Sequence, residues 1–132
     1  MYRDHLLETG VQQEQIVFIN FEDMDYEELQ DYKKLYSYLK ERLLKDRYTY
    51  IFLDEVQKVE GFEKVMDSLY IKDNVDIYIT GSTSNLLSGE LATLLSGRYI
   101  EISMLPLSFA EYCQLNSGAD NDIIELFYKS YI

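Results

Sequence analysis

Apolar residues follow two patterns along the chain, and each pattern predicts one kind of element. Short, nearly continuous runs rich in Ile, Val, Phe and Tyr are typical of strands covered on both faces. Longer stretches repeat an apolar residue every three or four positions, as amphipathic helices do. The short runs predict strands at 16–21, 50–54, 76–80 and 99–103. The spaced stretches predict helices at 2–9, 26–45, 62–70, 85–96, 108–115 and 122–131.

The alternation of these strands and helices predicts an α/β fold with a parallel sheet and right-handed crossovers. No repeat or linker interrupts the order, so we expect one domain over residues 1–132. Ligands of such sheets bind beyond the carboxyl ends of the strands. The polar residues at those ends are Asp23, Asp54, Glu55, Thr80, Ser82 and Ser103.

Two helix ends carry their own signals. Gly10 is placed to cap the C-terminus of the first predicted helix, because glycine adopts the left-handed conformation found there. No N-cap residue precedes that helix, which indicates that the chain begins inside an element. Ser108 and Glu111 form a capping-box pattern at the start of another predicted helix.

Composition narrows the possible functions. The formal net charge is −12, and an acidic chain repels phosphate backbones, so nucleic-acid binding by this chain alone is not expected. The single cysteine, Cys113, allows no internal disulfide, which fits a reducing cytoplasm. No apolar run approaches the roughly 20 residues that a membrane helix needs, and residues 1–10 have no signal-peptide character.

The strand at 50–54 ends in two adjacent acids, Asp54 and Glu55. An apolar strand followed by Asp-Glu is the Walker B pattern of ATPases. A stiff strand fixes its terminal carboxylate, so Asp54 can hold hydrated Mg²⁺ through its waters. Glu55 can polarise the attacking water. The alternative interpretation is a strand followed by a solvated turn.

Beyond this motif, the chain resembles the prokaryotic AAA-type ATPases of the archaeal-ATPase-like group, in which a P-loop core precedes a C-terminal region of unknown function. The likeness covers most of the chain, and INFED at 19–23 resembles the end of the family's second strand. The further matching segments are FLDEVQ at 52–57, GFE at 61–63, ITGS at 79–82, LLS at 86–88, GRY at 97–99 and LPLSF at 105–109.

The resemblance implies a role for each candidate residue, with ATP and Mg²⁺ as cofactors. Asp54 would be the Mg²⁺-side acid and Glu55 the catalytic base, and Gln57 would lie near the nucleotide. Thr80 or Ser82 would be the sensor that hydrogen-bonds the γ-phosphate or the attacking water. The alternative is a strand end at which Ser82 or Ser84 caps the next helix. Both interpretations can hold together, with Ser84 as the cap and Thr80 or Ser82 as the sensor.

Arg98 has two interpretations. It follows the glycine that ends a predicted helix, and it would contact phosphate as an arginine finger does, within one chain or from a neighbour. Alternatively, it serves the carbonyls at the helix C-terminus or a surface acid.

One departure from the family pattern is large. No G-x-x-x-x-G-K-[ST] run occurs in the 132 residues, although this loop grips the phosphates in P-loop proteins. Residues 2–9 resemble the tail of the helix that the loop opens. The resemblance then implies a three-layer P-loop NTPase-like sheet of order 5-1-4-3-2 whose first, central strand is missing. We expect strands 76–80 and 99–103 to pair directly, or a second copy to fill the gap by dimerisation or swapping.

The sequence therefore predicts a fragment of an ATP-hydrolysing AAA-type ATPase that is inactive without its P-loop. A second hypothesis is a non-catalytic acidic module, derived from such a domain, that binds a basic partner. A third is a metal-dependent nuclease or phosphatase that uses Asp23, Asp54 and Glu55.

Overall fold

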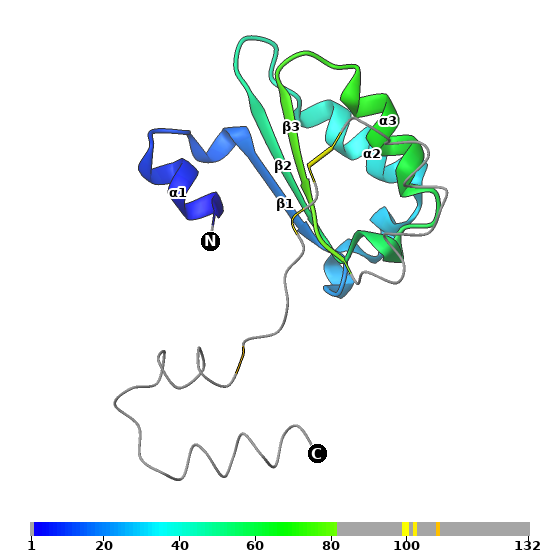
Figure 1. The fold of residues 1–132 in the computed structure, drawn as a ribbon. Coiled ribbons are helices and arrows are strands. Elements are labelled where there is room, and N and C mark those ends of the chain that lie inside the picture. The colour runs from blue at the N-terminus through cyan, green and yellow to red at the C-terminus, as the bar shows by residue number, and fades with distance from the viewer. Residues whose placement is uncertain (1, 82–98, 101, 103–107, 109–132) are drawn as a thin grey trace, which may run out of the picture. The chain divides into compact units, whose positions relative to one another are not determined.

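The computed structural model describes residues 2–81 together with Tyr99, Ile100, Ile102 and Ser108. The chain divides into two compact units, Met1–Tyr99 and Ile100–Ile132. The helices and strands described all belong to the first unit (Figure 1). The helices predicted at 85–96 and 122–131, and the helix predicted at 108–115 apart from Ser108, lie outside the described residues. Residues 101 and 103 of the strand predicted at 99–103 also lie outside them, so that strand stays a prediction. Across the described part, no helix is long and apolar enough to cross a membrane.

A three-stranded parallel sheet organises the described part. Its strands are β1 (Ile16–Asn20), β2 (Thr49–Asp54) and β3 (Val75–Ile79), in the spatial order β1-β2-β3. The register sets Phe18 opposite Phe52 and Phe52 opposite Tyr78. The three strands predicted in this stretch and their α/β class are confirmed.

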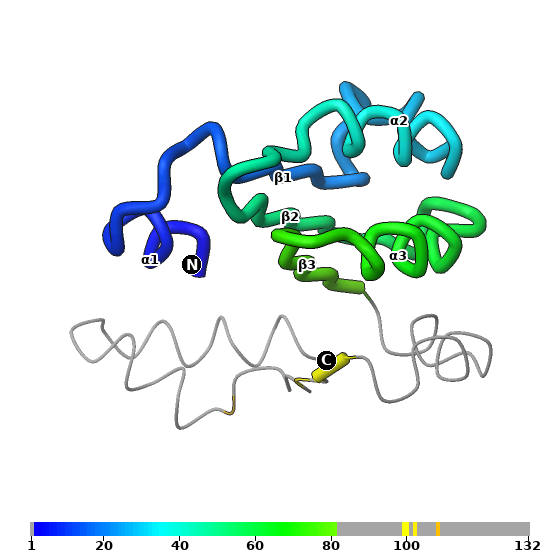
Figure 2. Tube along the Cα trace, turned by 90° about the horizontal axis from the view of Figure 1, so that it is seen from above, coloured from blue at the N-terminus to red at the C-terminus, as the bar shows by residue number. Residues whose placement is uncertain are grey.

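One face of the sheet carries the apolar core. It is covered by α2 (Tyr32–Arg42) and α3 (Phe62–Tyr70), which lie side by side on the same side of the strands (Figure 2). Each fully buried Leu, Ile or Phe stabilises the fold by roughly 1.5–3 kcal/mol. The most deeply buried members are Ile19, Phe21, Leu35, Leu39, Ile51, Leu53, Val56, Val59, Val65 and Leu69.

The opposite face is only half-buried. Along β2, Thr49, Ile51 and Leu53 are buried, whereas the residues between them are half-exposed. All five residues of β3 are likewise half-exposed. The prediction of strands covered on both faces is therefore wrong for β2 and β3, because the helix on this side, α1 (Tyr2–Glu8), has one buried residue, Leu6.

Aromatic rings fill much of this second face. The rings of Phe52 and Tyr78 stack with their centroids 4.8 Å apart. Tyr2 of α1 adds a ring 5.1 Å from Tyr78 and 6.5 Å from Phe52. Arg3 lies over Phe18, with the guanidinium carbon 5.7 Å from the ring centre. The described chain thus has three layers: α1, the sheet, and the pair α2 and α3.

The helix predicted at 26–45 is wrong in its first part. Met24–Gln30 form a 3₁₀-helix, η2, and α2 begins only at Tyr32. Between them, Asp31 is extended and its carboxylate accepts hydrogen bonds from the amides of Lys33 (2.8 Å) and Lys34 (3.0 Å). An acceptor at this position satisfies free N–H groups of a new helix, so it starts one there.

Two other helix predictions agree with the structure, whereas α2 ends at Arg42 and not at the predicted residue 45. Gly10 has φ of +98°, and the chain closes α1 with hydrogen bonds from Gly10 N to Leu7 O and from Val11 N to Leu6 O, each 3.1 Å. The helix predicted at 62–70 spans those residues.

We predict that Asp31→Ala lowers the thermal midpoint by several degrees and that Asp31→Asn, which keeps a capping oxygen, lowers it much less. The hydrogen bonds from the Lys34 and Lys33 amides hold the pKa of Asp31 below its ordinary 3.8. A lowered pKa gives stability that is present above 3.8 and lost as the pH falls below it. The thermal midpoints of the wild type and Asp31→Ala should therefore approach each other at low pH, whereas the Asn cap does not titrate and should keep its advantage over Asp31→Ala. A gap between the wild type and Asp31→Ala that is the same at every pH contradicts a charged cap.

A second prediction concerns Tyr78, whose hydroxyl donates to Asp76 Oδ2 at 2.7 Å. Burial, together with hydrogen bonds to Asp76 and Tyr2, raises the pKa of Tyr78 above its ordinary 10. A raised pKa gives stability that is complete below pH 10 and is lost as the pH rises, because the unfolded tyrosine ionises first. Urea unfolding across this range should show a shallower alkaline loss for Tyr78→Phe than for the wild type. Equal slopes would show that the phenol is not buried in this way.

Candidate functional site

The carboxyl ends of the strands bring three polar residues into one row. Asn20 ends β1 opposite Asp54, which ends β2. Thr80 follows β3, with its N–H bonded to Leu53 O at 2.9 Å and its carbonyl bonded to Val56 N at 3.1 Å. Because side chains alternate along strands, Asp54 lies on the face of Phe52 and Thr80 on the face of Tyr78. The row therefore lies directly beyond the aromatic rings, at the rim of the half-exposed face.

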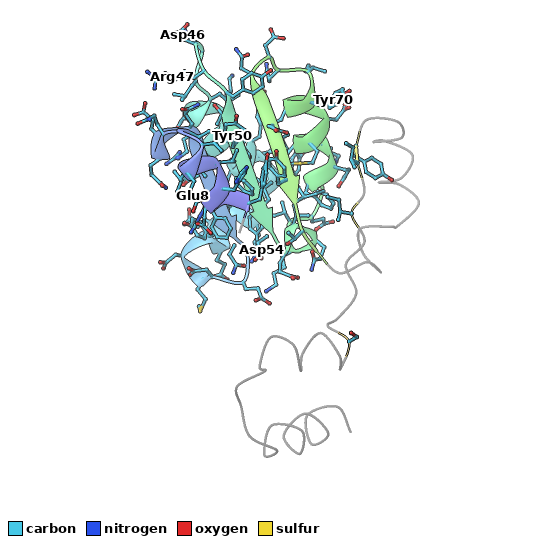
Figure 3. All side chains as sticks on the ribbon, turned by 60° about the vertical axis from the view of Figure 1, so that its left-hand side comes forward. Glu8, Asp46, Arg47, Tyr50, Asp54 and Tyr70 are labelled. Atoms are coloured by element: carbon cyan, nitrogen blue, oxygen red, sulfur yellow. The ribbon has the colours of Figure 1, made fainter. Side chains whose placement is uncertain are left out.

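Figure 3 shows Asp54 at this rim, at the opposite end of β2 from Asp46 and Arg47. The Thr80 hydroxyl donates to Asp54 Oδ1 and accepts from the backbone N–H of Glu55 at 3.3 Å. One hydroxyl on β3 thus fixes both the carboxylate that ends β2 and the start of the following turn.

Glu55 leaves the strand in an unusual conformation. Its φ is 55° and its ψ is 43°, in the left-handed region, which few residues other than glycine adopt. The short 3₁₀-helix η3 (Val56–Lys58) begins immediately after it. Val56 and Val59 anchor this turn, because both are buried in the core. The reversal separates Glu55 from Asp54 in direction although the two are neighbours in sequence.

Gln57, in the middle of η3, contacts Glu55. Its side-chain nitrogen Nε2 donates to Glu55 Oε2. Its side-chain oxygen Oε1 is buried and has no hydrogen-bond partner among the described residues. The predicted position of Gln57 near a nucleotide stays a prediction, whereas its contact with Glu55 was not anticipated.

Asp54 and Glu55 are the two carboxylates of this rim. Within the described part of the chain, neither belongs to an ion pair. Mg²⁺ suits this donor set, because it takes one or two carboxylates and completes its octahedron with water and phosphate oxygens. Asp54 is the residue that would hold it.

The three-carboxylate hypothesis is wrong. Among residues 2–81 and the four later described positions, no group of three or more His, Cys, Asp or Glu is placed to share a metal ion. Asp23 is occupied at the start of η2, where its carboxylate accepts from Asp25 N at 2.9 Å. A nuclease or phosphatase site built from Asp23, Asp54 and Glu55 is therefore not formed.

Two predicted site residues, Ser82 and Arg98, lie outside the described residues, and their roles stay predictions. Sequence reasoning did not include Asn20 in the site. Asn20 is aligned with Asp54 by the strand register, and its side-chain oxygen accepts from Glu22 N at 2.9 Å. The sequence does contain a signal for Asn20. It is a polar residue at the end of β1, and β1 is the strand that pairs with the strand ending in Asp54.

Comparison with known proteins now places the chain in a class. A family model described as "AAA domain" matches residues 1–113, so the chain belongs to this family of P-loop ATPase-like domains. An uncharacterized protein of Haemophilus influenzae is 41% identical over 132 residues, which are 98% of this chain and 33% of that protein. The uncharacterized protein MJ1544 of Methanocaldococcus jannaschii is 34% identical over 106 residues, 76% of this chain and 22% of that one.

The chain thus spans a third or less of the length of these curated relatives. No solved structure gives a significant match to it. The family membership supports a nucleotide-binding type of fold, and the printed names of the two relatives state no activity.

We predict that Thr80→Val speeds hydrogen exchange of the Glu55 amide by about three- to tenfold, the range expected for losing one ordinary hydrogen bond. Thr80→Ser keeps the hydroxyl and should exchange like the wild type. Amide exchange followed by NMR measures this, with Leu53 as an internal reference in the core. Equal protection in the valine variant would show that the hydroxyl does not hold the turn.

Proposed function

We propose that this chain supplies the Walker B and sensor half of an ATP-binding and ATP-hydrolysing site in an AAA-type ATPase. The observation that carries the proposal is the contact between Thr80 and Asp54 at the carboxyl rim of a parallel sheet. This is the place where ligands of such sheets bind. Membership of the AAA domain family supports the same assignment.

Each residue of the rim has a role in this proposal. Asp54 binds Mg²⁺ through water, and the ion supplies positive charge to the phosphate oxygens when it is bound. Glu55 orients the attacking water and accepts its proton. Thr80 makes the polar contact with the terminal phosphate or with that water, and Ser82 and Arg98 are further candidates for phosphate contacts.

The phosphates of ATP also need a phosphate-binding loop. These 132 residues do not contain one, because the Walker A run is absent from them. Without backbone N–H groups and a lysine around the phosphates, Asp54 and Glu55 mainly repel a triphosphate. We therefore propose that the 132 residues alone bind ATP very weakly and that a complete site requires a Walker A loop from elsewhere.

A second candidate is a non-catalytic acidic module that binds a basic partner. Two observations favour it: the net charge of −12 and the absence of a Walker A run from these residues.

We also propose that the chain associates with itself through exposed strand edges. A measurement of its molecular mass in solution would detect this association.

The decisive experiment compares Mg²⁺-dependent ATP hydrolysis by residues 1–132 with that by a longer gene product containing a Walker A loop. We predict background turnover for the former and clear turnover for the latter. In the longer protein, Glu55→Gln should lower kcat by about 10²–10⁴-fold while ATP binding persists, since a general base contributes about that much. Glu41→Gln, on the exposed side of α2, is the matched control and should retain activity.

Two results would contradict the proposal. Turnover by residues 1–132 alone that Glu55→Gln abolishes would show that no outside loop is needed. A longer protein that carries the loop but neither binds nor hydrolyses ATP would favour the acidic interaction module.

A further inference from the structure

The amide of Gln57 is the least expected polar group at the rim. It lies two residues after Glu55 in η3, a turn whose flanking residues Val56 and Val59 are buried in the core. The turn is also fixed by hydrogen bonds from Val56 N to Thr80 O and from Lys58 N to Glu55 O, each 3.1 Å. Gln57 and Glu55 therefore project from one rigid loop.

The orientation of the Gln57 amide is set by Glu55. The nitrogen Nε2 faces Glu55 Oε2 and donates to it. The reverse orientation would place Oε1 against an ionised carboxylate, and two acceptors repel each other. The donation from Nε2 therefore fixes the direction of the amide relative to the Glu55 carboxylate.

The other end of the amide is buried. Gln57 Oε1 has no hydrogen-bond partner among the described residues, a costly state for an acceptor. Within the described part of the chain, Glu55 is therefore the hydrogen-bond partner of this amide.

We propose that Gln57 is a positioning residue that fixes the direction of the Glu55 carboxylate, rather than a contact of the nucleotide. The inference rests on the proposed function, in which Glu55 accepts a proton from water.

The contact is tested directly by NMR of the side-chain NH₂ group in residues 1–132. The signals are assigned by their loss in Gln57→Leu. We expect one of the two protons to be shifted from the free-amide position in the wild type and to return to the free position in Glu55→Ala. Gln57 signals that are the same in the wild type and in Glu55→Ala would overturn the inference whether or not the protein is an ATPase.

The kinetic consequence is tested in the ATP-hydrolysing longer protein. Gln57→Leu and the isosteric Gln57→Glu should each lower kcat by about tenfold or more, because a hydrogen bond to a charged group is lost. KM for ATP should change little, because the role of Gln57 is to direct Glu55 and not to contact the nucleotide. Gln15→Leu is the matched control, since Gln15 donates to Tyr48 O at 3.0 Å where β1 begins.

Two kinetic outcomes contradict the positioning role. A raised KM with an unchanged kcat would make Gln57 a nucleotide contact. A loss of kcat that is accompanied by a lower thermal midpoint and matched by Gln15→Leu would make it a structural residue only. Failure of the wild type to hydrolyse ATP would instead count against the proposed function, and the NMR result would still decide whether Gln57 holds Glu55.

Discussion

The pairing of β2 between β1 and β3 is the constraint on which the rest of the described structure depends. Ile51 and Leu53 are buried against α2 and α3, so the alternation of the strand sends Asp54 to the opposite, half-exposed face. A slip of one residue would bury the carboxylate and expose both aliphatic side chains. The free energy that such a slip would cost fixes Asp54 on the half-exposed face. The parallel register then places Thr80 beside Asp54.

Much of this could be predicted from sequence because the strands are short, apolar and well separated. The ends of β1, β2 and β3 differ from their predicted ends by a residue or so. The sheet order then follows from the resemblance to AAA-type ATPases. The split between η2 and α2 was missed because the apolar stripe continues through Asp31, and spacing alone does not reveal that its carboxylate caps a new helix.

Other features depend on tertiary contacts that the sequence pattern does not reveal. Phe52 and Tyr78 are as apolar in sequence as fully buried residues, yet they lie on a face that α1 only partly covers. The contact of Gln57 with Glu55 depends on the left-handed backbone at Glu55. Nothing in a run of Glu-Val-Gln signals that conformation, because it arises where the turn is tied to Thr80 and anchored by buried valines.

The hydrogen bond of the Thr80 hydroxyl also limits what else this hydroxyl can bind at the rim. A hydroxyl has a single proton to give, and here Asp54 receives it. In the proposed ATP site, a phosphate oxygen that accepts from Thr80 would replace Asp54 as the acceptor of this proton, and the released carboxylate oxygen would be free to bind a cation. Binding of the anion and of the cation would then be coupled through this one hydrogen bond.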